Sequence, residues 1–193
     1  MNMIRKTQLE KWQKLGEKKV LAKSFGVELS TQNFTNPKTR KTETFSIFCK
    51  KEGIIICPIT ENGNVVLVRQ FKQGVDDFVL EFPAGSLEKS DKSRAEAGKR
   101  ELLEETGYVP NNVIAIETAN HIAPRKSPSS EYVVIATNCR LTSQQNLDAS
   151  EGDIEVFEVS VATLFDLIKS GEITSAPTKL AVLTALVHGY LSL

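Results

Sequence analysis

Residues 85–108 read GSLEKSDKSRAEAGKRELLEETGY, and this stretch decides how the chain is interpreted. A polar loop leads into a helix that carries its own start and stop signals. Ser93 and Glu96 form a candidate capping box, and Gly107 can adopt the left-handed conformation that ends a helix. The pattern predicts a helix over residues 93–106.

Three carboxylates fall on one face of that helix. At about 100° per residue, Glu101, Glu104 and Glu105 project to the same side. Like charges at these spacings repel, and a hard divalent cation such as Mg²⁺ would neutralise them with its preference for oxygen ligands. The alternative is a solvated acidic face in which Arg100 pairs with Glu96 and Glu104. The residues around the helix favour the metal site.

The chain as a whole has the composition of an ordinary globular protein. Of its 193 residues, 40% are hydrophobic and 25% are charged, which fits one core. Twenty-four basic residues balance twenty-four acidic ones, so the net charge predicts no attraction to nucleic acid or to anionic membranes. No stretch is apolar enough for a membrane span or a secretory signal, and we expect a cytoplasmic protein.

Two regions are expected from the order of the elements. Residues 1–50 are more polar and predict a β-arm, with a short helix over 1–15 and strands over 19–29 and 44–49. Residues 51–193 predict a mixed sheet flanked by helices, which is an α/β fold. The expected strands are 54–59, 65–69, 78–82, 113–117, 131–137 and 154–160, and the further helices are 161–169 and 177–190.

The carboxylate helix resembles the second half of the Nudix box, whose pattern is GX5EX7REUXEEXGU with U a bulky apolar residue. Residues 100–108, RELLEETGY, match it, and Pro83, Ala84 and Gly85 precede it as in ADP-ribose pyrophosphatase relatives. The similarity extends over VVLVRQFKQGVDDFVLEFPAG and most of the chain. It implies a Nudix α/β/α sandwich with a mixed β-sheet and an added N-terminal antiparallel β-region.

The resemblance also implies roles for the residues of this segment. Glu101 and Glu105 are expected to be the principal ligands of Mg²⁺, for which Mn²⁺ can substitute. Glu104 is expected to assist them, and the Ala84 carbonyl to complete one coordination shell. Arg100 is expected to orient a carboxylate, so Arg100 and Glu105 are counted as catalytic residues.

One position departs from the Nudix pattern. Counted from Gly85, the first acidic position falls on Asp91, and eight residues instead of seven separate it from Arg100. Counted back from Arg100, the same position is Lys92. A one-residue insertion in the loop explains the shift, and it puts full activity in doubt more than the fold.

The resemblance places the general base on an acidic loop before a late strand, which here reads SEGDIEV at residues 150–156. Glu151 is the preferred base and Asp153 the second choice, and the alternative is that these acids only face solvent.

Four residues are candidates for substrate contacts. Arg69 and Lys72 follow the strand that is expected to face the cleft, and either could meet a phosphate, although relatives often have Arg where Lys72 stands. Glu81 could contact ribose or base, or pair with a neighbour in the sheet. Pro124 stands sixteen residues after Tyr108, as the proline of ADP-ribose pyrophosphatases does.

The expected reaction is the Mg²⁺-dependent hydrolysis of a nucleoside diphosphate sugar, with ADP-ribose cut to AMP and ribose 5-phosphate. GDP-mannose or another nucleotide sugar is the first alternative, because the loops choose the substrate. A sensor that binds ADP-ribose without cutting it is the second. The resemblance also implies a homodimer with exchanged N-terminal strands, for which Trp12, Phe25 and Phe34 are possible interface aromatics.

Overall fold

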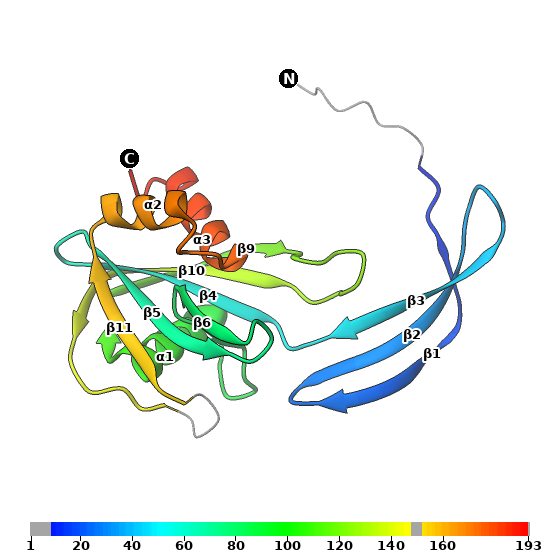
Figure 1. Ribbon diagram of the computed structural model, residues 1–193, viewed down its shortest axis with the longest axis horizontal. Coiled ribbons are helices and arrows are strands. Elements are labelled where there is room, and N and C mark those ends of the chain that lie inside the picture. Colours follow the sequence, from blue (N-terminus) through cyan, green and yellow to red (C-terminus); the bar gives the residue numbers. More distant parts are fainter. Residues whose placement is uncertain (1–8, 148–151, 193) are drawn as a thin grey trace. The chain divides into compact units, whose positions relative to one another are not determined.

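The computed structural model describes residues 9–147 and 152–192 of the chain (Figure 1). The chain divides into two compact units. Unit 1 consists of the described residues up to Lys51 together with Ala123–Ser129, and unit 2 consists of Glu52–Ile122 together with the described residues from Ser130 onward. Each unit has a sheet of its own.

Unit 1 contains an antiparallel sheet with the strand order β1 (Gln13–Ser24), β2 (Val27–Thr35) and β3 (Thr42–Cys49). A tight turn joins β1 to β2, and both of its residues, Phe25 and Gly26, have positive φ. The single strand expected over residues 19–29 is therefore a hairpin, while the strand expected over 44–49 is confirmed within β3.

The helix expected over residues 1–15 is wrong where the structure describes it, because β1 already begins at Gln13. The ring of Trp12 packs edge-on against Phe45, with 5.6 Å between centroids, and Phe34 contacts Phe45 at the same distance. Helix propensity is a weak preference, and strand pairing with aromatic packing outweighs it here. Residues 1–8 lie outside the described part of the chain.

One loop from the middle of the sequence belongs to unit 1. The backbone N–H of Phe48 donates to the carbonyl of Lys126 at 2.9 Å, and the N–H of Lys50 donates to the Ser129 hydroxyl at 2.8 Å. These bonds attach Ala123–Ser129 to the end of β3. The sequence pattern had placed this loop with the residues of unit 2.

Unit 2 is built around one mixed sheet with the path β11-β5-β4-β10-β8, to which β6, β7 and β9 add by pairing with β5, β4 and β10. β4 and β10 run parallel, and the other pairs are antiparallel. All six strands expected in this region are confirmed. The strands are β4 (Gly53–Thr60), β5 (Val65–Lys72), β6 (Asp77–Glu81), β7 (Ala84–Ser86), β8 (Tyr108–Val109), β9 (Asn112–Asn120), β10 (Glu131–Leu141) and β11 (Ile154–Val159).

Helices cover both faces of this sheet, as Figure 1 shows. Successive side chains of a strand point to opposite faces, so β4 contributes to two cores. Ile54 and Ile56 pack with residues of α1 (Arg94–Thr106). Ile55 and Cys57 pack with residues of α2 (Val161–Ser170) and α3 (Ala176–Val187). The expected α/β/α sandwich with a mixed sheet is confirmed. No helix in the described ranges is long and apolar enough to cross a membrane.

Candidate active site

The helix α1 starts and stops where its signals predict. The Ser93 hydroxyl accepts the N–H of Glu96 at 3.1 Å, and Gly107 adopts φ 75° while its N–H donates to the Leu103 carbonyl at 2.8 Å. In a capping box the Glu96 carboxylate would accept the backbone N–H of Ser93. Here it accepts the N–H of the preceding residue, Lys92, at 3.0 Å. Both ends of α1 are thus fixed by local bonds.

Two carboxylates of α1 are bound to the backbone of the short strand β7. The N–H of Ala84 donates to Glu105 Oε2 at 3.1 Å, and the N–H of Ser86 donates to Glu101 Oε1 at 3.2 Å. A spacing of four residues puts both glutamates on the same helix face. β7 in turn pairs with β4 through Gly53–Ile55, so the central sheet holds the strand that holds the glutamates.

Gly85 makes this approach sterically possible. A Cβ built on Gly85 would lie 1.9 Å from the carboxyl carbon of Glu101, which is far closer than two carbon atoms can come. On the same helix, a Cβ at Gly98 would lie 2.8 Å from Val134 Cγ1 on β10. One glycine lets the carboxylate reach the strand, and the other lets the helix lie close to the sheet.

Burial decides between the two interpretations of the acidic face. Glu101 is 7% exposed and Glu105 is 2% exposed, so this is not a solvated face. Charged groups are seldom buried at this level unless they are paired or coordinate metal. Burial raises the pKa of Glu101 above its usual value, and the positive charge of Arg100 counteracts part of that rise.

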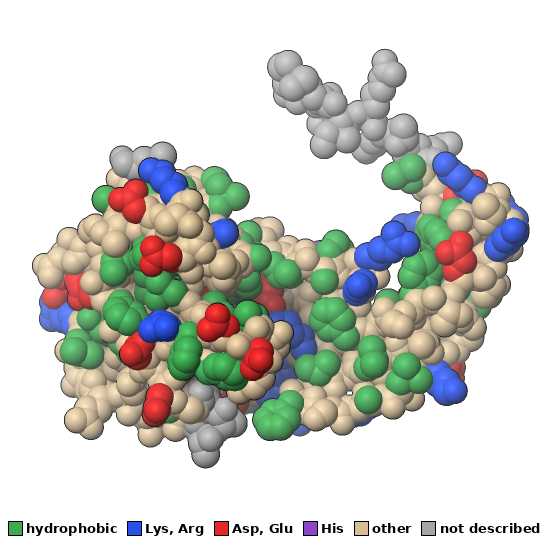
Figure 2. Space-filling model, viewed as in Figure 1, with side chains coloured by type: hydrophobic (Ala, Val, Ile, Leu, Met, Phe, Trp, Pro, Cys, Tyr) green, Lys and Arg blue, Asp and Glu red, His purple; other side chains and the backbone are tan. Residues whose placement is uncertain are grey.

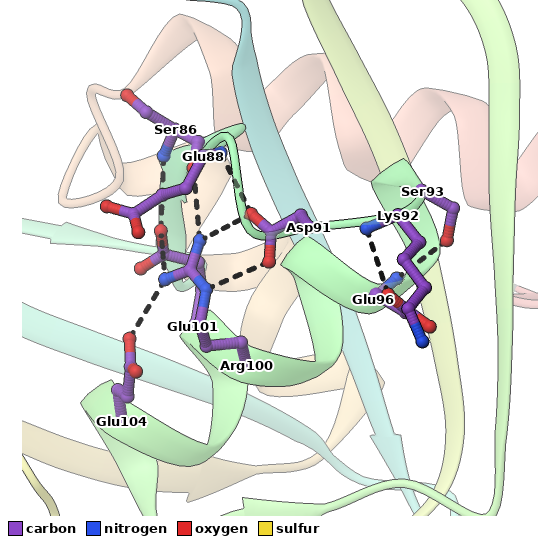
Figure 3. A network of polar contacts seen from close by, with 9 residues as sticks. All are labelled: Ser86, Glu88, Asp91, Lys92, Ser93, Glu96, Arg100, Glu101 and Glu104. Carbon is purple, nitrogen blue, oxygen red and sulfur yellow. Dashed lines mark hydrogen bonds and ion pairs between the residues drawn. The ribbon is translucent and has the colours of Figure 1, made fainter.

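Arg100 is the centre of a polar network around the loop (Figure 3). Its Nε and Nη2 donate to the two carboxylate oxygens of Asp91 at 3.1 and 2.9 Å, and Nη2 also donates to the Ser86 carbonyl at 3.2 Å. Its Nη1 lies 3.0 Å from Glu101 Oε1 and 3.0 Å from Glu104 Oε2. Arg100 therefore pairs with Glu104, as the alternative interpretation proposed, but its other partners are Glu101 and Asp91 instead of Glu96.

The first acidic position of the Nudix pattern could fall on Asp91 or Lys92, and Asp91 is the one whose side chain contacts Arg100. The N–H of Glu88 also donates to Asp91 Oδ2 at 2.8 Å. The hydrogen bonds from Arg100 hold the pKa of Asp91 below its usual value. The extra residue lies between Asp91 and Arg100, and the carboxylate still reaches the arginine. Lys92, the residue at the other possible count, is exposed and contributes its backbone N–H.

The donor set fits a hard divalent cation, although the carboxylates are not gathered around a common point. Among the described residues, no three Asp, Glu, His or Cys side chains lie close enough together to hold an ion. A carboxylate can accept about four hydrogen bonds or metal contacts, so Glu101, Glu104 and Glu105 keep capacity for a cation. The space that the missing Cβ of Gly85 leaves beside Glu101, and a donor set made only of oxygen atoms, support that fit.

The family of the chain follows from comparison with known proteins. The family description NUDIX domain matches residues 50–179. The chain belongs to the Nudix family. It is 32% identical over 131 residues to an ADP-ribose pyrophosphatase of Bacillus subtilis (strain 168), a match that covers 67% of this chain and 69% of that protein.

A second relative and one solved structure extend the comparison. The chain is 31% identical over 162 residues to an ADP-sugar pyrophosphatase of Mus musculus, covering 79% of this chain and 73% of that protein. A crystal structure of an ADP compounds hydrolase superposes with a TM-score of 0.79 at 20% identity, over 96% of this chain and all of that one. At that identity the superposition shows the Nudix fold, and α1 is the Nudix helix.

The two predicted phosphate contacts lie on opposite faces of the Nudix sheet. Alternation along β5 puts Lys72 on the face that carries the Nudix helix and Arg69 on the face covered by α2 and α3. Lys72 Nζ lies 2.7 Å from Glu81 Oε1, so these two candidates pair with each other. Arg69 donates to Glu155 at 3.3 Å and lies over the ring of Phe78.

Of two further candidates, one belongs to unit 1 and the other lies outside the described residues. Pro124 lines a pocket of ≈ 690 Å³ in unit 1. Glu151 lies outside the described residues, and Asp153, the second candidate for the base, is exposed. The pocket is lined by Trp12, Lys14, Lys18, Ser30, Gln32, Phe34, Phe45, Ile47, Cys49, Pro124, Arg125, Ser127 and Pro128.

Two supporting residues of the Nudix site were not predicted from the sequence. The hydroxyl of Thr178, on α3 and 1% exposed, accepts the N–H of Phe82 at 3.0 Å, just before Pro83 and β7. The Gln145 side chain contacts the carbonyls of Glu105 and Ile154. Neither residue stands in a motif, and each is far in sequence from its partners, so no local pattern could have identified it.

Proposed function

We propose that the protein hydrolyses the diphosphate bond of an ADP-sugar, with ADP-ribose cut to AMP and ribose 5-phosphate. The observation that carries the proposal is the buried pair Glu101 and Glu105, held against the backbone of β7. A buried pair of carboxylates of this kind has a reason to exist if it binds a cation. The names of the two relatives supply the substrate class.

In this proposal Mg²⁺, or Mn²⁺ in its place, supplies positive charge that neutralises the diphosphate oxygens and lowers the pKa of an attacking water. Glu101 and Glu105 would hold it, with Glu104 and the Ala84 carbonyl as further oxygen donors. Arg100 fixes the orientation of Glu101 and Glu104. Water adds to one phosphorus, the bridging P–O bond breaks, and an acid of the segment before β11, Glu151 or Asp153, accepts the proton of the water.

Lys72 is the proposed phosphate contact, because it shares the sheet face of the Nudix helix and is only partly exposed. Its present partner Glu81 keeps the ammonium group in place until a phosphate competes for it. Arg69 is the weaker candidate on geometric grounds, since it lies on the other face of the sheet.

The deciding experiment compares the wild type with Glu105→Gln on ADP-ribose, GDP-mannose, NADH and nucleoside diphosphates with Mg²⁺, and identifies the products. We expect AMP and ribose 5-phosphate from the wild type and a loss of at least about 100-fold in kcat for the variant, with an unchanged fold. Glu88→Gln, on an exposed residue of the loop that precedes α1, is the control. GMP with mannose 1-phosphate as the best products would transfer the assignment to GDP-mannose.

The sensor that binds without cutting is the other outcome of that panel. It would show as tight ADP-ribose binding without product under excess Mg²⁺. The displaced acidic position raised this alternative, and the bidentate contact of Asp91 with Arg100 removes much of its basis. A Glu105→Gln variant that retains turnover would overturn the proposed role of that carboxylate.

We also propose that the unit 1 pocket binds a nucleotide base. Trp12, Phe34 and Phe45 form an aromatic cluster in its wall, Arg125 lies 5.7 Å from the Phe45 ring centre, and Pro124 borders the same space. Aromatic walls with nearby cations suit a base that carries phosphate. AMP should quench the fluorescence of Trp12, the single tryptophan, while ribose 5-phosphate at the same concentration should not. Equal quenching by both compounds would contradict the proposal.

A homodimer is the proposed assembly, and the charges of the two units support it. The segments of unit 1 carry fourteen basic and four acidic residues, and those of unit 2 carry ten basic and twenty acidic ones. Figure 2 shows several of the Lys and Arg side chains, in blue, over β1 to β3. The net charge of zero is therefore the sum of a basic unit 1 and an acidic unit 2. Opposite charges of this kind favour contact between unit 1 of one copy and unit 2 of another. Light scattering should give a dimer at micromolar concentration, weakened by salt.

A further inference from the structure

The C-terminal end of the Nudix helix is capped by a segment distant in sequence. The last carbonyls of a helix have no partner within it and need donors from elsewhere. The N–H of Asn146 donates to the Glu104 carbonyl at 2.9 Å, and the N–H of Thr142 donates to the Gly107 carbonyl at 3.0 Å. Residues 142–146, which follow β10, therefore hold the turn of α1 that carries Glu104 and Glu105.

One side chain of this segment reaches two elements at once. Gln145 Nε2 donates to the carbonyl of Glu105 at 2.5 Å and to the carbonyl of Ile154, the first residue of β11, at 2.9 Å. Both partners are carbonyl oxygens, so only the NH₂ group of the amide can face them, and both of its hydrogens are used. Gln145 is half-buried, whereas its neighbours Gln144 and Asn146 are exposed.

The bridge connects two parts of the proposed machinery. The Glu105 side chain is bound to β7 through the Ala84 N–H, and its backbone carbonyl is bound to Gln145. Ile154 directly follows Asp153 and the acidic segment that is expected to supply the base. A single amide thus sets the spacing between the helix turn that would hold the metal and the start of the strand that follows the base.

We propose that Gln145 is a positioning residue that couples the last turn of the Nudix helix to the start of β11. The expected effect on kinetics rests on the proposed hydrolase function. The bridge itself is a structural property that can be measured without substrate. Displacements of about 1 Å at a reacting group can cost on the order of 100-fold in rate, so loss of the bridge affects turnover more than substrate affinity.

The test compares Gln145→Glu and Gln145→Ala with Gln144→Ala, whose side chain is exposed one residue earlier. Gln145→Glu keeps the shape of the side chain but offers no donor and sets a negative charge against two carbonyls. We expect kcat to fall roughly 10- to 100-fold with KM within about threefold, and the pH profile of kcat to shift. A residue that only stabilises the fold would lower Tm and leave kcat, measured below Tm, and the pH profile unchanged.

Hydrogen–deuterium exchange gives a readout that does not depend on activity. Peptides covering residues 103–107 and 154–157 should exchange faster in Gln145→Ala than in the wild type, and as in the wild type in Gln144→Ala. Unchanged exchange in both peptides, or wild-type kcat in both Gln145 variants, would overturn the proposal. A wild-type protein that cuts no compound of the panel would overturn the hydrolase function alone, and the exchange result would still decide the role of Gln145.

Discussion

Asp91 accepts two hydrogen bonds from Arg100, one on each carboxylate oxygen, at 3.1 and 2.9 Å. Bidentate contacts of this kind are among the stronger ion pairs in proteins. Asp91 is one residue farther from Arg100 than the Nudix spacing expects. The contact with Arg100 depends on where the carboxylate lies and not on the number of residues between the two. A loop of altered length can therefore still place the carboxylate beside Arg100.

Replacing Asp91 with Asn should destabilise the protein by about 1–3 kcal/mol near neutral pH, since a half-buried charge-assisted pair is broken. The pKa of Asp91 in the folded protein lies below its ordinary value of 3.8. The stabilisation is therefore complete above that value and is lost as the pH falls through the lower folded pKa. Urea unfolding of both proteins between pH 3 and 7 measures the difference.

Glu88→Gln serves as the control for the Asp91 variant, because only the backbone N–H of Glu88 contributes to the contact. The difference between Asp91→Asn and the wild type should shrink below about pH 4. A difference that stays the same at pH 3 and pH 7 would show that charge is not its origin.

Gly85→Ala tests whether the close approach of Glu101 to β7 is needed. The new Cβ would stand 1.9 Å from the Glu101 carboxyl carbon, so the carboxylate must move away from the Ser86 amide. We expect kcat to fall by at least about 10-fold, because a ligand of the proposed metal is displaced. Gly74→Ala is the matched control, since nothing lies within 4 Å of a Cβ at Gly74. Equal kcat in the two variants would contradict the prediction.

Periodic and capping signals were enough to predict most of unit 2. The Nudix helix has its own caps at Ser93 and Gly107, and each strand in the expected set is long enough for alternation or a buried run to be visible. β7, with three residues, is too short for such a signal. It is nevertheless the strand that holds Glu101 and Glu105.

Contacts between distant residues could not be predicted, because they depend on the path of the chain between elements. The pairing of Lys72 with Glu81 requires the β5–β6 register, and the bridge from Gln145 requires the end of β10 to return to α1. Residues 13–18 of β1 were missed for a related reason, whereas residues 19–24 fall within the strand expected over 19–29. The polar sequence of residues 13–18 has no clear period, and its conformation comes from pairing with β2.

Lys72→Ala should weaken substrate binding more than Arg69→Ala does. Lys72 lies on the sheet face of the Nudix helix, and a charged hydrogen bond to phosphate contributes about 1.5–3 kcal/mol. We therefore expect KM for ADP-ribose to rise roughly 10- to 100-fold in Lys72→Ala and by less than about threefold in Arg69→Ala, with kcat little changed in both. Steady-state kinetics on purified variants measures this, and a larger effect at Arg69 would reverse the assignment.

Glu101→Gln should make the metal-free protein more stable near neutral pH while it removes activity. Burial raises the pKa of Glu101 in the folded protein above its ordinary value of 4.5. Its contribution to stability is therefore present below 4.5 and is lost as the pH rises through the folded pKa. A permanently neutral glutamine avoids that loss, so Tm in excess EDTA at pH 7 should exceed that of the wild type, and the gap should close below pH 4.5.

Glu104→Gln is the comparison for that prediction, because the Glu104 side chain is 35% exposed, against 9% for Glu101, and ion pairs of more exposed groups contribute little to stability. It should change Tm little at any pH. If Glu101→Gln instead lowers Tm at pH 7, the hydrogen bonds from Ser86 and Arg100 outweigh the burial of the charge. A higher Tm with lost turnover would show that the protein keeps a costly buried carboxylate at this position for the sake of its chemistry.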